Sequence, residues 1–231
     1  MTITYLSHSG FLVELDHMVL LFDYYEGTIP SIPKNKPFFV FASHRHADHF
    51  NPMILELAKK HSNIMFILSY DIWRKRVPEY LWEKTVHLEP NSVWEWSGMK
   101  VETLKSTDEG VAFLVEAEGK TFYHAGDLND WRWEGEDKAW NEKMEKDFKA
   151  YIEPLRGRVI DAAFVPLDPR QEKNYTLGMD YFLELAEVKR VYPMHVWGDY
   201  TIINRWFLEH PAHSKKDRIV KITGGGEIFE Q

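Results

Sequence analysis

The chain has 231 residues, of which 44% are hydrophobic and 15% aromatic, enough to bury one sizeable core. Its formal net charge is −8, so no global basic field would attract phosphate backbones, and small molecules are expected as partners rather than nucleic acid. The absence of cysteine excludes disulfides, thiolate nucleophiles and sulfur-ligated zinc. Any bound metal must therefore be held by histidine and carboxylate side chains.

The N-terminal segment has neither the pattern of a signal peptide nor that of a membrane span. It carries no basic lead, and Asp16 and His17 interrupt its apolar run. We therefore expect a cytoplasmic protein with no membrane partner.

Short apolar segments separated by turn signals occupy the first half of the chain and predict strands, whereas helical patterns appear later. Strands are predicted at 2–6, 11–15, 18–22, 38–42, 63–68, 93–98, 100–104, 111–117, 120–126, 159–167, 190–195, 218–222 and 227–230. Helices are predicted at 52–61, 136–154, 181–188 and 201–210. The segment 38–42, FFVFA, is so uniformly apolar that it should be buried on both faces. With no linker or repeat, residues 1–231 are expected to form a single mixed α/β domain.

The stretch after this buried strand, ASHRHADHF, concentrates metal-ligand side chains at His44, His46, Asp48 and His49. In extended backbone, residues two apart point the same way, so His44 and His46 can reach one ion while Asp48 and His49 turn toward a second point. Asn51 and Pro52 then form a helix start. The stretch is therefore a strand-to-helix connection at a sheet edge, where sites often lie.

Four ligands on one loop cannot close two metal sites, so distant partners are needed. Asp127 and His195 both end apolar strands and are the best candidates. With the H-x-H-x-D-H signature, the G-D pair at Asp127 and the late strand-end histidine, the sequence resembles the metallo-β-lactamase superfamily. Through YLSHSGFLVEL, LLFDYY, KTFYHAGD and YPMHVWGDY, it looks most like the ascorbate-6-phosphate lactonase-like metal-dependent hydrolases.

This resemblance covers almost the whole chain and implies a four-layer αββα sandwich with a metal site along one edge of the paired sheets. It implies that His44 and His46 bind a first ion, that Asp48, His49 and His195 bind a second, and that Asp127 bridges them. The family's further histidine is missing here, where the chain reads ETLKSTDEGVAFL. Asp108 is the most plausible oxygen substitute, but an ordinary turn residue ahead of Gly110 is slightly favoured. The first site is therefore expected to be the weaker one.

Such a site offers metal-assisted hydrolysis, in which a metal-bound hydroxide attacks the substrate without a serine or cysteine nucleophile. Asp48 is expected to orient the attacking water or to shuttle its proton. The nitrogen-rich ligand set favours two zinc ions, although manganese and iron also accept imidazole and carboxylate.

Several residues near these ligands could have either a role in the site or a purely structural one. His8 could face the site or lie in a surface turn, and His124 and Asp23 are expected to support ligands rather than to bind metal. Trp131 and Trp133 could wall a substrate pocket or belong to the core.

Asp168 and Arg170 lie at the end of another strand. They could form a structural ion pair, or Arg170 could bind an anion while Asp168 orients it. The function expected from these residues is hydrolysis of a small, anionic ester, lactone or phosphoester. The alternative is a non-catalytic metal-binding or regulatory protein that retains the fold, and the missing histidine is the feature that favours it.

Overall fold

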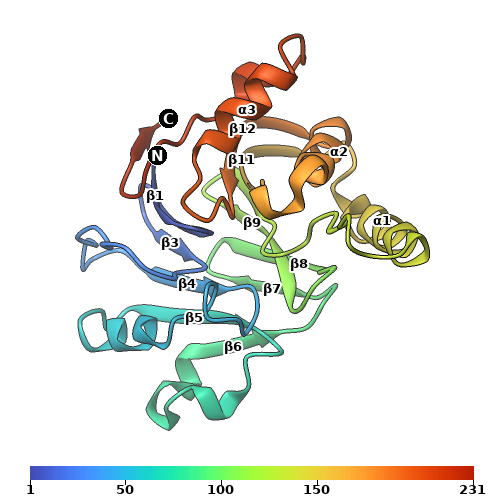
Figure 1. Ribbon diagram of the computed structural model, residues 1–231. Coiled ribbons are helices and arrows are strands. Elements are labelled where there is room, and N and C mark those ends of the chain that lie inside the picture. The colour runs from blue at the N-terminus through green and yellow to red at the C-terminus, as the bar shows by residue number, and fades with distance from the viewer.

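The computed structural model describes residues 1–231 and contains two β-sheets that pack face to face, with helices outside them (Figure 1). The seven-stranded sheet has the order β13-β1-β2-β3-β4-β5-β6, and the six-stranded sheet has the order β12-β11-β10-β9-β8-β7. The strands are β1 (Thr2–Ser7), β2 (Gly10–Glu14), β3 (Val19–Phe22), β4 (Phe38–Ala42), β5 (Ile64–Ser69), β6 (Thr85–Leu88), β7 (Val93–Trp96), β8 (Met99–Lys105), β9 (Val111–Ala117), β10 (Lys120–His124), β11 (Val159–Pro166), β12 (Glu187–Met194) and β13 (Ile228–Glu230).

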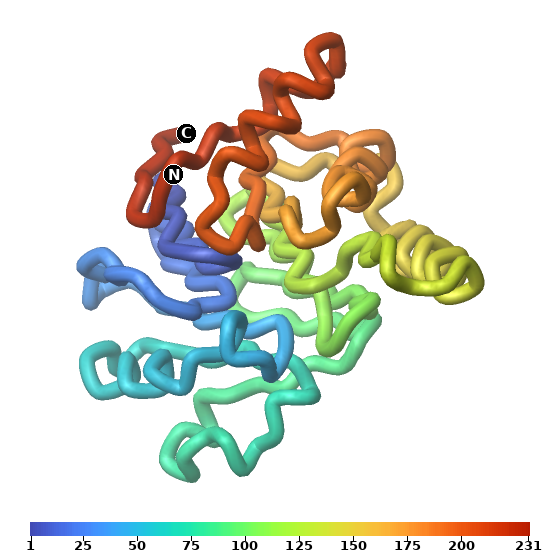
Figure 2. The backbone as a smooth tube through the Cα atoms, viewed as in Figure 1, coloured from blue at the N-terminus to red at the C-terminus, as the bar shows by residue number.

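Each sheet combines hairpins with parallel crossovers. In the seven-stranded sheet, β1, β2 and β3 are antiparallel, whereas β3 to β6 are parallel. In the six-stranded sheet, β7 to β10 are antiparallel, whereas β10 to β12 are parallel. The two ends of the chain lie side by side in the trace (Figure 2), because β1 also pairs with β13.

Strand β4 shows how the sequence produces the layers. Successive side chains of a strand point to opposite faces, and in β4 Phe39 and Phe41 join the core between the sheets while Phe38 and Val40 join a second cluster outside. Rings from the two sheets meet directly, as in the pair Phe41 and Phe113, whose centroids are 5.3 Å apart. All of β4 is buried, which confirms the prediction of burial on both faces.

The helices cover the outer faces. The α-helices α1 (Lys138–Ile152), α2 (Leu177–Leu185) and α3 (Thr201–Glu209) bury Phe148, Phe182 and Trp206 in the core that includes the six-stranded sheet. The 3-10 helices η1 (Pro52–Lys59) and η3 (Glu79–Lys84) bury Ile54, Leu55 and Leu81 in the outer cluster of the seven-stranded sheet. The layers are therefore helix, sheet, sheet, helix, as predicted. No helix combines the length and the apolarity needed to cross a bilayer.

Most predicted elements are present, and the differences have local causes. The segment 52–61 begins at the predicted cap, where the Asn51 side chain accepts from the backbone of Met53, but it forms a 3-10 helix. The segment 218–222 is not a strand, because beyond an isolated bridge from Ile219 to Val191 it runs as an irregular segment that buries Ile219 and Ile222. The short strand β6 was not predicted.

Candidate metal centre

The metal-ligand loop lies at the end of β4, and its backbone is folded back on itself. The amides of His49 and Phe50 both donate to the carbonyl of His46, at 3.1 and 2.8 Å. This turn places His44 and His49 inside the protein, fully buried, while His46 is exposed at the surface. One short loop thus presents its side chains in two directions.

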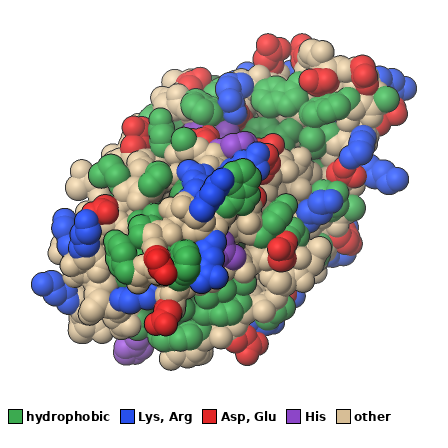
Figure 3. All heavy atoms as spheres, turned by 90° about the horizontal axis from the view of Figure 1, so that it is seen from below, with side chains coloured by type: hydrophobic (Ala, Val, Ile, Leu, Met, Phe, Trp, Pro, Cys, Tyr) green, Lys and Arg blue, Asp and Glu red, His purple; other side chains and the backbone are tan.

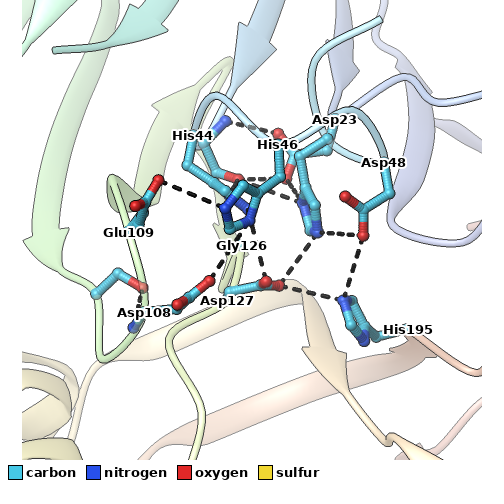
Figure 4. Close-up of polar contacts among 12 residues, drawn as sticks. Asp23, His44, His46, Asp48, Asp108, Glu109, Gly126, Asp127 and His195 are labelled. Carbon is cyan, nitrogen blue, oxygen red and sulfur yellow. Dashed lines mark hydrogen bonds and ion pairs between the residues drawn. The ribbon is translucent and has the colours of Figure 1, made fainter. Parts of the chain in front are cut away.

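The first group of candidate ligands consists of His44, His46, Asp108 and Asp127. The His44 Nε2 atom lies 3.0 Å from His46 Nδ1 and 3.6 Å from Asp127 Oδ2. Asp108 Oδ2 lies 3.6 Å from His46 Nδ1. The four ligand atoms all lie within 4.8 Å of one another, so one ion could contact all of them (Figure 4).

The second group consists of His8, Asp48, His49 and His195. Asp48 Oδ2 lies 3.2 Å from His8 Nε2, 3.7 Å from His49 Nε2 and 3.9 Å from His195 Nε2. Asp127 Oδ1 lies 3.2 Å from His49 Nε2 and 3.4 Å from His195 Nε2. Because the other oxygen of Asp127 faces His44, this carboxylate lies between the two groups.

Several buried polar atoms of the two groups have no hydrogen-bond partner, and this tests whether the site suits a metal. They include Nε2 of His49, Nε2 of His195 and Oδ1 of Asp127. A buried polar atom without a partner costs free energy. The two histidine nitrogens lie 3.2 and 3.4 Å from Asp127 Oδ1, but the atoms are not aligned as hydrogen-bond donor and acceptor. Ligand atoms that converge on one cation have this arrangement, so the residues fit divalent metal.

In three candidate histidine ligands, a carboxylate lies near the outer ring nitrogen, which is the one that points away from the other candidate ligands. His49 Nδ1 lies 2.7 Å from Asp23, and His195 Nδ1 lies 2.8 Å from Asp168. His46 Nε2 lies 3.5 Å from Glu109, which also pairs with Arg45. A proton donated from the outer nitrogen to such a carboxylate leaves the inner nitrogen free for metal, as is usual for metal-bound histidine.

The charges of the site favour ligands in their metal-binding protonation states, except at His49. Burial lowers the pKa of His44 to about 4, so this imidazole is neutral at pH 7. Burial acts to raise the pKa of Asp127, but the charges of His49 and His195 outweigh it and hold that pKa well below its usual range. Burial acts to lower the pKa of His49, but the Asp127 carboxylate outweighs it and raises that pKa well above the ordinary value. A metal must therefore displace a proton at His49.

Backbone conformation around the site is unusual for non-glycine residues. His8, Asp23, His195 and Trp197 have φ of 53°, 40°, 64° and 51°, in the left-handed region. Each follows a strand of the two sheets within a few residues, and the turn redirects the chain there. Such conformations persist only where the surrounding structure holds them.

Two loops of the six-stranded sheet approach the ligand loop at glycines. A Cβ atom on Gly126 would lie 2.6 Å from the Cβ of Ser43, and one on Gly110 would lie 2.0 Å from the Ser43 carbonyl oxygen. Both glycines also have positive φ. Any other residue would push apart the loops that carry Asp108, Asp127 and His44.

The structure brings together all six residues predicted as ligands: His44, His46, Asp48, His49, Asp127 and His195. It adds Asp108, for which a turn role had been favoured, and His8, which is buried and faces Asp48.

The two residues predicted to support metal ligands, His124 and Asp23, both lie next to the site. His124 lies outside both groups, stacks on Phe22 and has Nε2 2.9 Å from the Ser9 carbonyl. Asp23 is buried against His49, as expected of a supporting residue.

Of the residues predicted to contact substrate, some line a cavity and one is buried away from it. Trp131, Trp133 and Arg170 line a cavity of about 230 Å³ next to Asp108 and Asp127. Asp168, in contrast, is fully buried and contacts His195, Arg170 and the indole nitrogen of Trp197. Its position is that of a partner for His195 rather than of a residue that reaches substrate.

Sequence reasoning missed some neighbours of the site. Glu109 directly follows Asp108, and its charge next to a candidate ligand was the available signal. The segment Trp73 to Arg76 places three consecutive cations after an exposed tryptophan, and Arg76 donates to the carbonyl of Arg45 in the ligand loop. Figure 3 shows Lys and Arg side chains among hydrophobic ones on the lower face of the molecule.

Comparison with known proteins agrees with this architecture. A family model described as a β-lactamase superfamily domain matches residues 2–139. A metal-dependent hydrolase of Opitutus terrae is 33% identical over 146 aligned residues, covering 55% of this chain and 63% of that relative. The chain therefore spans less than two thirds of that relative's length.

Solved structures show the fold. A metallo hydrolase of Ignicoccus hospitalis is 18% identical with a TM-score of 0.63, and the match covers 100% of this chain and 98% of the other. A proposed metal-dependent hydrolase of Parabacteroides distasonis is 18% identical with a TM-score of 0.67, and the match covers 94% and 90% of the two chains. At these identities the similarity establishes a shared fold.

Proposed function

The chain belongs to the β-lactamase superfamily, and on that premise we propose that it is a metal-dependent hydrolase of a small ester, lactone or phosphoester. The observation that carries the proposal is the convergence of two ligand groups on either side of Asp127, with buried ring nitrogens that have no hydrogen-bond partner. No comparable set of histidine and carboxylate atoms occurs elsewhere in the chain.

In this proposal, His44, His46, Asp108 and Asp127 hold the first ion, and Asp48, His49, His195 and Asp127 hold the second, with His8 beside it. We propose zinc, with manganese or iron as alternatives, because imidazole and carboxylate ligands suit all three. Bound divalent cations would polarise the bond under attack and lower the pKa of water.

The chain's own residues have separate tasks around this reaction. Burial acts to raise the pKa of Asp48, but the contact with His8 outweighs it, so the carboxylate is ionised at neutral pH. It is partly exposed, at 23%, and can therefore orient water and accept its proton. The neighbouring His8 ring, with a pKa lowered by burial, is a neutral partner that can hold Asp48 in place.

Substrate contacts are proposed for the cavity next to Asp127. Arg170 donates from Nε and Nη2 to Asp168, and Nη1 is not used in that pair. That atom could contact an anionic group of the substrate, and Trp131 and Trp133 could contact its apolar part. An anionic substrate would match the ascorbate-6-phosphate lactonase-like branch, whose resemblance motivates this finer proposal.

We also propose that residues 1–231 act as one domain, and two observations support this. Helices α2 and α3, and α1 from residue 140 onward, lie beyond the segment matched by the family model, yet they bury side chains in the same core as β1 and β2. His195 also comes from this later part and faces Asp127.

Elemental analysis of purified protein tests the proposal. Wild type should carry divalent metal, and both His46→Ala and His195→Ala should lose part of it, whereas His17→Ala, at an exposed position outside the site, should not. Activity on simple esters, lactones and phosphodiesters should disappear with a chelator and return with added metal. Unchanged metal content in both site variants would reject the ligand assignment, and metal binding without hydrolysis of any substrate would favour the non-catalytic alternative.

A further inference from the structure

An aromatic cavity opens beside the first ligand group. Its volume is about 230 Å³, and Asp108 and Asp127 stand at the end nearest the candidate metal centre. Its other walls include Trp133, Trp140 and Met144. Three apolar side chains thus surround a space that begins at two candidate ligands.

The position of Trp140 is not explained by core packing. Helix α1 buries Phe148 and Ile152 in its C-terminal half, but Trp140, in its first turn, is 36% exposed and faces the cavity with Met144. Large aromatic side chains that stay partly exposed are frequent in ligand pockets.

The part of the lining formed by Trp131 and Trp133 is held in a fixed position. The Trp131 and Trp133 rings are nearly parallel, at 6° with centroids 5.9 Å apart. Trp131 donates from its indole nitrogen to the carbonyl of Asp127, at 2.8 Å. The Asn141 side chain of α1 accepts from the Trp133 amide and donates to the Trp133 carbonyl, at 3.0 and 2.8 Å. These bonds tie the tryptophan wall to both α1 and a candidate ligand.

Charge gives the cavity only limited selectivity. Arg170 is the cation in its lining, but it forms a bidentate pair with the fully buried Asp168 and lies over the Trp197 ring. Its Nε and Nη2 atoms are therefore used by Asp168, and only Nη1 remains for an anionic group of the substrate. Shape and apolar area are the main determinants of which uncharged part of a substrate this space accepts.

We propose that the cavity binds a planar, apolar group of the substrate, such as an aromatic ring, with the bond to be cleaved at Asp108 and Asp127. This inference rests on the proposed hydrolase function and narrows its substrate to aryl-containing esters or phosphoesters. Trp133 and Trp140 then determine specificity by contact with the ring, on the side of the first ligand group.

Equilibrium dialysis with 2-naphthol, which is planar and neutral, tests the binding step without any hydrolysis. Wild type should bind 2-naphthol more tightly than cyclohexanol, and Trp140→Ala and Trp133→Ala should each weaken 2-naphthol binding roughly tenfold, because an aromatic contact and its buried area are lost. Trp73→Ala is the matched control, since Trp73 is 54% exposed and is not among the residues that line the cavity. Trp140 is on the surface of α1, so its removal should leave the fold and metal content unchanged.

Kinetics distinguish failure of this inference from failure of the proposed function. With 2-naphthyl acetate, Trp140→Ala should raise KM about tenfold, a larger rise than with ethyl acetate, which has no ring. Equal 2-naphthol binding by wild type and both variants would overturn the aromatic site, even if esters are hydrolysed. If no ester, lactone or phosphoester is hydrolysed while tryptophan-dependent 2-naphthol binding persists, the hydrolase function fails and the aromatic site is upheld.

Discussion

Asp23 allows a sharp test of how the protein prepares His49 for metal. Its side chain is fully buried after β3 and accepts from the Ser43 amide at 2.7 Å, from the Ser43 hydroxyl at 2.5 Å and from His49 Nδ1 at 2.7 Å. Three donors therefore converge on one carboxylate. The substitution Asp23→Asn keeps the shape and replaces one acceptor oxygen by a donor.

Neither orientation of the new amide can satisfy all three donors. If its nitrogen takes the place of Oδ2, it faces His49 Nδ1, which must then accept, so the His49 proton moves to Nε2 and blocks the metal-binding atom. If the amide is flipped, its nitrogen faces the Ser43 amide, and a buried donor is left unpaired at a cost of about 1–3 kcal/mol. Loss of a partner outside the metal shell typically costs about 10–100-fold in metal affinity, and we expect that loss for Asp23→Asn.

The substitution Asp23→Ala should be more severe for stability. It leaves the partners of a buried charge without any acceptor, at a cost of about 3–5 kcal/mol, a large part of a typical stability of about 5–15 kcal/mol. Chelator competition measures metal affinity, and urea unfolding of the metal-free protein measures stability. Asp16→Asn, at an exposed position, is the control. Wild-type metal affinity in Asp23→Asn would refute the argument from the His49 tautomer.

Four further predictions concern the same centre. Asp108→Ala should release metal from the first group at a lower chelator concentration than wild type, and an unchanged release curve would return Asp108 to a turn role. Gly126→Ala should lower the thermal midpoint, at a cost of about 1–3 kcal/mol, because its Cβ would lie 2.6 Å from that of Ser43; a stable variant with full metal content would contradict the close approach. Removal of metal should also lower the midpoint, since a ligand at 100 times its Kd stabilises by about 2.7 kcal/mol, and calorimetry with and without chelator measures the difference. Arg170→Ala should raise KM for an anionic substrate more than it lowers kcat, and unchanged kinetics would leave Arg170 as a structural partner of Asp168.

Local sequence spacing predicted the part of the centre that lies on one loop. His44, His46, Asp48 and His49 follow a strand that is apolar throughout, and strand ends gather at a sheet edge. The same reasoning placed Asp127 and His195 at the edge, although they belong to the other sheet. That they meet the loop was predicted from the family resemblance. The sequence pattern of one sheet does not show how the second sheet packs against it.

Where the structure differs from the sequence-based expectation, the position of the residue is set by packing between elements that are distant in sequence. Asp108 lies in an ordinary turn sequence between β8 and β9, and only the close approach at Gly110 brings it to His46. Trp140, Met144 and Phe148 are spaced four residues apart, so helical periodicity puts them on one face of α1. It could not tell that the face runs from the core at one end to a cavity at the other.

The left-handed backbone at His8, His195 and Trp197 has a consequence for how such a protein can be improved. Glycine adopts this conformation without the steric cost that a side chain adds, so selection for thermal stability alone would favour glycine at these positions. Glycine at position 8 or 195 would remove an imidazole from the second group, and at position 197 it would remove the ring that Arg170 covers. Stability and function therefore oppose each other at positions 8 and 195, and a stabilised variant should draw its substitutions from the surface of α3 instead.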